Sequence, residues 1–263
     1  MRSAAGVVSG RRARPLRHAA LGAVLALAGL LLALPAAWAQ APWPAQAPGQ
    51  WGLAIVDVET TGLDPAFHEM IDIGAIYTDL DGNELGRFFV RIQPPHPQRA
   101  EPGAVAVNGY SPTRWRELGA VDEGEAVVAF LDFHARVGAG RRFVFTAYNA
   151  QFDRGFVDAL LNRHGRDFDD FYTYFLLDIP SMAWGLGITD LANARVAEQL
   201  GLEAETSDPL RHTGATGADW NLQIYRALRQ RRLGRRRFRS RRPLPSEGRR
   251  ALPAGDCCSA WSA

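Results

Sequence analysis

The chain contains no lysine, and all 30 of its basic residues are arginine. A P-loop nucleotidase needs a lysine that grips the substrate phosphates, so the sequence excludes that class of enzyme. Cysteine is almost absent as well. The two cysteines, Cys257 and Cys258, are neighbours near the C-terminus, which excludes a core disulfide and a thiolate metal site in the rest of the chain.

Positive charge is scarce between residues 40 and 225, although the net charge of the whole chain is +2. This stretch holds 13 arginines against 26 of the 28 acidic residues, a formal charge of −13. A general duplex-binding protein would present clustered arginines on its folded domain, so the acidic stretch argues against that function. A surplus of carboxylates suits a divalent-cation site, although ordinary solvated acids account for most of them.

Residues 1–39 are predicted to be a signal peptide or a membrane anchor. Four arginines between positions 11 and 17 precede an uncharged Leu/Ala-rich run at 19–37, and an A-x-A cleavage pattern ends at Ala39. The apolar run is long for a signal peptide, which keeps the uncleaved anchor as an alternative. Either way, we expect the folded domain outside the cytoplasm: periplasmic, secreted, or held at the membrane.

The remaining chain divides into a linker, one domain and a tail. Residues 40–50 are rich in Pro, Ala and Gln and predict a linker. The domain is expected at 51–233, a length that suits one sizeable core. Residues 234–263 are rich in Arg, Pro and Ser without apolar periodicity, which predicts a basic disordered tail. Its arginines suit nucleic acid phosphates or an anionic membrane, and an inert solvated tail is the alternative.

The domain shows the pattern of an α/β fold. Three apolar runs at 53–58, 70–77 and 88–92 predict strands, with a hairpin turn at 81–83. Further strands are predicted at 143–147 and 174–179, and helices at 125–137, 152–161, 191–200 and 215–233. Three early strands followed by alternating helices and strands imply a mixed β-sheet flanked by α-helices.

Two acidic stretches carry the candidate chemistry. Asp57 and Glu59 end an apolar strand, and because side chains alternate along a strand, both point to the same face. Paired carboxylates there repel each other unless a cation lies between them, and such hard oxygen ligands suit Mg²⁺ or Mn²⁺. Asp153 follows where a later strand passes into a helix, although a helix dipole alone also favours an acid in the first turn.

Five stretches of the chain match a known family: IVDVETTGLDP (55–65), MIDIGAIYTD (70–79), AVAVNGYSP (104–112), AYNAQFDRGFV (147–157) and HTG (212–214). With them the chain resembles the DEDD-type (DnaQ-like) family of 3′-to-5′ exonucleases, most of all ribonuclease T and the proofreading domain of DNA polymerase III. The resemblance covers about residues 51–228. It implies a ribonuclease-H-like fold and hydrolysis of the terminal phosphodiester at a free 3′ end, which releases 5′-monophosphates.

Most functional residues of the family have a counterpart in this chain. The resemblance implies that Asp57, Glu59 and Asp153 bind a two-metal centre of Mg²⁺ or Mn²⁺ and that His212 is the general base. Thr60, Gly62 and Leu63 would line the pocket for the 3′ nucleotide. The implied partners are single-stranded or short DNA or RNA with a free 3′ end, and a second copy of the chain in a homodimer.

One position departs from the family pattern. The family carries a fourth carboxylate five residues after the histidine, where this chain has Gly217. Asp219 stands two positions further on, which turns it by about 200° around an ideal helix. Asp219 reaches the metal site if the helix begins late or a two-residue loop insertion precedes it. Otherwise the alternative is a catalytically degenerate relative that binds nucleic acid without cutting it; an endonuclease or transposase of related fold fits the motif order less well.

Overall fold

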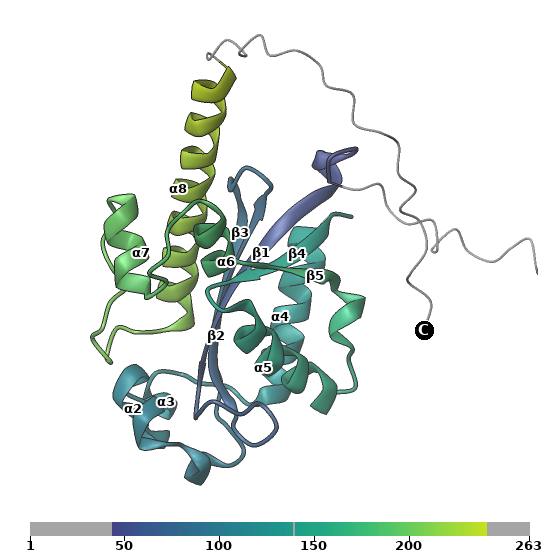
Figure 1. Cartoon of the computed structure of the whole chain (residues 1–263). Helices are drawn as coiled ribbons and strands as arrows, with labels where there is room; N and C mark the ends of the chain where they lie inside the picture. Colours follow the sequence, from purple (N-terminus) through teal and green to yellow (C-terminus); the bar gives the residue numbers. More distant parts are fainter. Residues whose placement is uncertain (1–43, 139, 241–263) are drawn as a thin grey trace, which may run out of the picture. The chain divides into compact units, whose positions relative to one another are not determined.

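The computed structural model describes residues 44–138 and 140–240 (Figure 1). Contacts divide the chain into one unit at 1–46 and a second at 47–263, and the fold described below is that of the second unit. The predicted signal or anchor segment at 1–39 lies outside the described residues, as do the first part of the predicted linker and residues 241–263 of the predicted tail.

In the described part of the chain, five strands form one mixed sheet in the order β3-β2-β1-β4-β5 (Figure 1). Antiparallel pairing joins β1 with β2 and β2 with β3, whereas β1 with β4 and β4 with β5 are parallel. The strands are β1 (Trp51–Thr60), β2 (Met70–Asp79), β3 (Glu84–Arg91), β4 (Arg142–Ala147) and β5 (Tyr172–Asp178). All five apolar runs therefore form strands, and the predicted α/β class is confirmed.

The central strand β1 is covered on both faces, as expected for a continuously apolar run. Leu53 and Ile55 pack against α8 (Gly214–Ser240), in a cluster with Ala218 and Leu222 of that helix. Ala54 and its alternating neighbours on the opposite face join the larger cluster with α4 (Glu123–Gly138) and α5 (Ala150–Arg163). This alternation assigns the next odd-numbered positions of β1, including the two acids, to the α8 side.

Three short helices were not predicted: α2 (Pro102–Asn108), α3 (Pro112–Glu117) and α6 (Ile179–Gly185). Each carries a proline in its first turn, where a missing N–H costs no hydrogen bond. Two also have side-chain caps, since Ser111 accepts a hydrogen bond from Arg114 N and Asp178 accepts one from Ser181 N. Pro102, Pro112 and Pro180 thus mark helix starts, and α2 forms part of the functional site.

Two ends of helices test the predicted boundaries. Gly201 ends α7 (Asn193–Leu200) in the left-handed conformation, with φ at 71°, as glycine commonly does at the C-terminal end of a helix. The last helix, α8, continues to Ser240 rather than ending at residue 233. Residues 234–240 thus belong to this helix in the structure, and arginine is a good helix former. Among the described residues, no helix combines the length and the apolar character needed to cross a membrane.

Glycines in both α8 and the sheet allow the start of α8 to lie very close to the strands. A Cβ atom on Gly74 of β2 would lie 2.1 Å from the backbone oxygen of Gly214, and one on Gly214 would lie 2.5 Å from the backbone oxygen of Asp57. Only glycine permits so close an approach of helix and strand. The residues that precede α8 are thereby held beside the end of β1.

Candidate active site

The site lies where the sheet splits beside β1. Strand β4 pairs with β1 only over Trp51–Ile55, and the chain then leaves the sheet through Asn149, whose φ is 69°. The last residues of β1 therefore have no strand partner on that side. The N–H of Val58 instead donates to Oδ1 of Asp153 at 3.1 Å, which ties the first turn of α5 to the strand.

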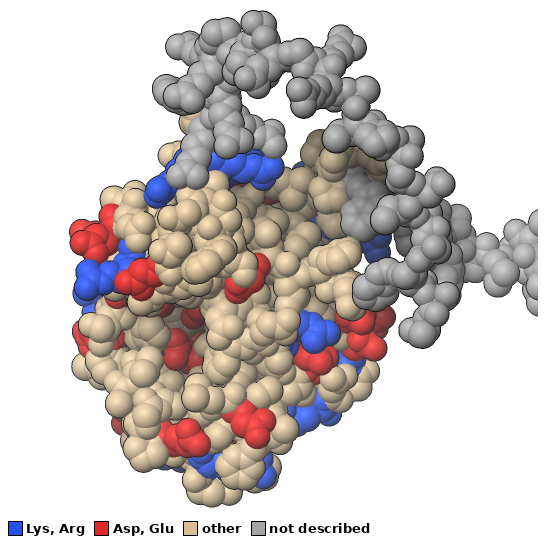
Figure 2. All heavy atoms as spheres, in the orientation of Figure 1, with Lys and Arg blue, Asp and Glu red and all other residues tan. Residues whose placement is uncertain are grey.

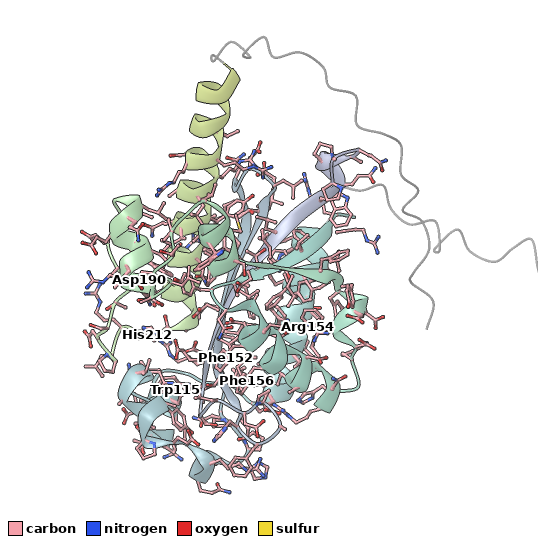
Figure 3. All side chains as sticks on the ribbon, viewed as in Figure 1. Trp115, Phe152, Arg154, Phe156, Asp190 and His212 are labelled. Carbon is pink, nitrogen blue, oxygen red and sulfur yellow. The ribbon has the colours of Figure 1, made fainter. Side chains whose placement is uncertain are left out.

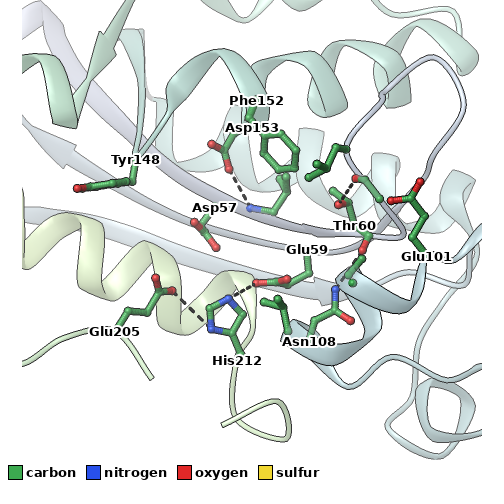
Figure 4. Close-up of a pocket in the computed structure, with 16 residues that line it drawn as sticks. Asp57, Glu59, Thr60, Glu101, Asn108, Tyr148, Phe152, Asp153, Glu205 and His212 are labelled. Carbon is green, nitrogen blue, oxygen red and sulfur yellow. Dashed lines mark hydrogen bonds and ion pairs between the residues drawn. The ribbon is translucent and has the colours of Figure 1, made fainter. Parts of the chain in front are cut away.

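Three predicted acids meet in one pocket of about 440 Å³ at this split. Asp57 and Glu59 come from β1 and Asp153 from α5, and Asp153 is only 2% exposed (Figure 4). Figure 2 shows a hollow in this face of the molecule with acidic side chains inside it. The structure therefore brings together carboxylates that are separated by about a hundred positions in the chain.

The electrostatics of this pocket disfavour its own negative charge. Burial raises the pKa of Asp57 well above its usual value, and the carboxylates of Asp153 and Glu59 raise it further. Burial likewise raises the pKa of Asp153, against the opposing effect of the hydrogen bond from Val58. Desolvated, mutually repelling carboxylates of this kind are stabilised by a cation placed between them.

The donor set fits a hard divalent cation. Carboxylate oxygens are the ligands that Mg²⁺ and Mn²⁺ prefer. As the described side chains stand, no group of three His, Cys, Asp or Glu residues is arranged to hold an ion. Asp153 accepts a hydrogen bond from Val58 N and Glu59 lies against His212, so each of these two carboxylates already has a protein partner at one oxygen.

His212 faces the acids from the segment that precedes α8. Its Nε2 lies 3.0 Å from Oε1 of Glu59, and its Nδ1 lies 2.8 Å from the backbone oxygen of Thr206. A carbonyl oxygen only accepts, so Nδ1 carries a proton and Nε2 is the nitrogen that faces the pocket. The bond to Glu59 raises the pKa of His212 to about 9, against the opposing effect of burial. Figure 3 shows His212 near the start of α8 and Phe152 on α5, two of the pocket residues.

The three predicted substrate-binding residues form another wall of the same pocket. Thr60 Oγ1 donates to the backbone oxygen of Gly62 at 2.7 Å, which closes the turn after β1. A Cβ atom on Gly62 would lie 2.4 Å from the ring of His68, so this position requires glycine. Leu63 is 76% exposed at the rim. Across from them, Asn108 of α2 donates to the backbone oxygen of Thr60 at 3.0 Å.

Asp219 does not join the other acids, which corrects its assignment as a metal ligand. Helix α8 begins at Gly214, so the late start that Asp219 needed does not occur. Its carboxylate is 45% exposed and pairs with Arg87 of β3 at 3.3 Å. Position 217 does face the site, because a Cβ atom on Gly217 would lie 2.2 Å from Oδ2 of Asp57. The family position is therefore in place on the helix and has no side chain.

The pocket also contains residues that the sequence did not single out. Glu205 comes from the loop between α7 and α8, Asn108 and Val107 from α2, and Tyr148 from the turn before α5. Asn108 and Tyr148 lie in stretches that carried the family resemblance, which was a usable signal. Glu205 stands among other acids in an irregular loop, and no pattern in the sequence distinguishes it.

Comparison with known proteins identifies the family. A family model described as "Exonuclease" (RNase_T) matches residues 54–213. The chain belongs to this exonuclease family. It is 27% identical over 164 residues to ribonuclease T of Shewanella frigidimarina (strain NCIMB 400), which covers 59% of this chain and 72% of the relative. Identity to ribonuclease T of Shewanella sp. (strain ANA-3) is 30% over 151 residues, 53% of this chain and 66% of the relative.

Solved structures show the same fold. The nuclease domain of 3′hExo, a DEDDh family member bound to rAMP, matches with a TM-score of 0.56. E. coli exonuclease I in complex with single-stranded DNA matches with a TM-score of 0.55. For 3′hExo the identity is 14%, over 70% of this chain and 92% of that domain. For exonuclease I it is 19%, over 72% of this chain, and the matched part is less than half of that protein, 43%.

These findings confirm two sequence-based predictions. The chain is a DnaQ-like 3′-to-5′ exonuclease, and it has the ribonuclease-H-like fold. The mixed sheet flanked by helices is the physical basis of that match.

Proposed function

We propose that this exonuclease is metal-dependent and hydrolyses the terminal phosphodiester bond of single-stranded or short nucleic acid, which yields 5′-monophosphates. The observation that carries the proposal is the meeting of Asp57, Glu59, Asp153 and His212 in one pocket from three separate parts of the chain. Each of these side chains is a poor fit to a buried environment on its own, and together they suit phosphodiester hydrolysis.

Each side chain has a distinct part in the proposed reaction. Asp57, Glu59 and Asp153 would hold Mg²⁺ or Mn²⁺, which stabilises the attacking and leaving oxygens when bound. His212 would take the proton of the attacking water at Nε2 in its neutral form, which requires Glu59 to release Nε2, because that contact raises the pKa of His212 to about 9. The Thr206 carbonyl holds the ring in place through Nδ1. Thr60, Gly62 and Leu63 would receive the 3′ nucleotide.

The surroundings of the pocket support a short or single-stranded substrate. No arginine is among the described residues that line the pocket, so long-range phosphate binding at its wall is weak. The exposed apolar surface at the rim, Leu63 and Val107, suits the faces of unpaired bases. The solved relatives hold single-stranded DNA in one case and rAMP in the other, which supports testing both nucleic acids.

The decisive assay uses matched DNA and RNA oligonucleotides labelled at the 3′ end. Mononucleotide release that requires Mg²⁺ or Mn²⁺ and stops on chelation is expected, and a 3′-blocked oligonucleotide should resist. Absence of release by the folded chain with metal present would refute the proposal. Cutting of closed circular DNA would assign the chain to endonucleases.

A second function is favoured by Gly217 alone. Without the fourth carboxylate on α8, the chain would bind nucleic acid and leave it uncut. Under this hypothesis Gly217→Asp switches on cleavage in a protein that is otherwise inactive. The substitution must displace the Asp57 carboxylate, because the new Cβ atom would lie 2.2 Å from its Oδ2.

We also propose that the domain works outside the cytoplasm, as the basic and apolar pattern of residues 1–39 predicts. Fractionation of cells that express the intact chain tests this: the proposal requires the domain in the periplasm, in the medium, or on the outer side of a membrane.

A homodimer is proposed as well. Tyr174 and Phe175 are exposed on the edge strand β5, a surface suited to pairing, and light scattering on the purified chain measures its mass.

A further inference from the structure

A fourth carboxylate enters the pocket from the loop between α7 and α8. Glu205 lines the same pocket as Asp57, Glu59 and Asp153 (Figure 4), and its side chain is only 13% exposed. Its Oε1 lies 3.9 Å from Nδ1 of His212, and Asn193 Nδ2 donates to its Oε2 at 3.2 Å. The loop therefore holds a largely buried acid on the wall opposite α5.

Glu205 belongs to the same electrostatic group as the three predicted acids. Its charge acts on both Asp57 and Asp153, and the charge of Glu59 acts on Glu205. Four largely buried carboxylates thus line one pocket, and His212 is the one basic side chain among the described residues that line it. A single imidazole cannot neutralise four carboxylates, which leaves room for positive charge from a bound cation.

None of the other candidate positions supplies a fourth buried acid to the pocket. At position 217 the space next to the helix is filled by the Asp57 carboxylate, and Asp219 is held by Arg87 outside the pocket. Glu101 also lines the pocket, but its side chain is 53% exposed and lies 3.2 Å from His68 Nε2. Glu205 is the acid that is both buried and turned inward.

We propose that Glu205 supplies the fourth carboxylate of the divalent-cation site, in place of the acid that the family carries at the position of Gly217. This inference rests on the proposed function, because it requires that the pocket binds a cation. It assigns the extra acid to the loop between α7 and α8 instead of to helix α8.

The test measures Mn²⁺ binding directly. The metal-free intact chain is titrated with Mn²⁺ by calorimetry as wild type, Glu205→Gln and Glu203→Gln. Glu203 is exposed, lies on the same loop and does not line the pocket, so its variant matches the change in charge. Glu205→Gln should weaken Mn²⁺ binding by about 10-fold or more, or remove one bound ion, whereas Glu203→Gln should stay within about twofold of wild type.

Several results would overturn the assignment. Equal Mn²⁺ affinity and stoichiometry in wild type and Glu205→Gln would do so. Unchanged Mn²⁺ binding with an altered titration of the His212 ring by NMR would instead make Glu205 a positioning residue for the histidine. If the wild type itself binds no Mn²⁺, the proposed function fails, which is a separate result. Thermal melting without metal checks folding, and Glu205→Asp, which keeps the charge, should bind Mn²⁺ more tightly than Glu205→Gln.

Discussion

The two halves of strand β1 are buried to a similar degree and have opposite energetic effects. The first half, Trp51–Val56, is apolar and packs on both faces, which stabilises the fold. The second half, 57–60, places two acids among buried groups, where desolvation and like charge oppose folding. Burial of the apolar first half therefore offsets the destabilising effect of the acids in the second half, as expected where function and folding compete.

Asp57→Asn should show the largest effect and separate the two halves most sharply. Loss of the central carboxylate should lower exonuclease activity by about 10³-fold, because charge stabilisation in the transition state depends on it. The metal-free protein should melt at a higher temperature than wild type at pH 8, since an uncharged amide avoids the cost of a buried charge. Activity assays and thermal melts measure both. Retained activity together with a lower melting temperature would contradict the assignment of the second half of β1 to function at a cost in stability.

Ile55→Ala tests the apolar half. Ile55 is fully buried between the sheet and α8, so its truncation should cost about 2–5 kcal/mol of unfolding free energy. Activity per folded molecule should change little, because the side chain lies outside the pocket. Chemical denaturation measures the loss. Val128→Ala, at an exposed position of α4, is the control and should cost far less.

Asp72→Asn tests how a buried acid beside the second half of β1 makes the stability of the fold depend on pH. Asp72 of β2 is buried beside Glu59, and burial raises its pKa from 3.8 to about 7. The folded state therefore holds a proton that the unfolded chain releases, so the stability from this group is complete below pH 3.8 and is lost as the pH rises to about 7. The variant should lose less stability between pH 5 and 8 than wild type, by melts at about one-unit steps. Asp132→Asn, an exposed acid on α4, should follow the wild-type curve.

Asp219→Asn should show the smallest effect. The substitution breaks an exposed pair with Arg87, which is worth about 0–1 kcal/mol. Activity and Mn²⁺ affinity should remain within about twofold of wild type, measured in the same assays as Asp57→Asn. A loss of activity as large as that of Asp57→Asn would show that Asp219 acts in the site, and Glu205 would then not be required as the fourth carboxylate.

Local rules predicted much of this exonuclease. Runs of β-branched and aromatic residues predicted all five strands, and strand alternation placed Asp57 and Glu59 on one face. The short helices α2 and α3 were missed, because prolines favour both loops and helix starts. The last helix was predicted too short, since the propensity of arginine for helix outweighed the lack of an apolar stripe.

The sequence by itself determined the five strands, the longer helices, the family resemblance and seven residues that line the pocket, because these depend on local periodicity and on motifs a few residues long. Only the tertiary structure decided that Asp219 turns toward Arg87 and that Glu205 turns inward. The direction of Asp219 depends on the start of α8 beside β1, where Gly214 and Gly217 allow a close approach. That approach is a contact between segments more than a hundred residues apart, and no local pattern encodes it.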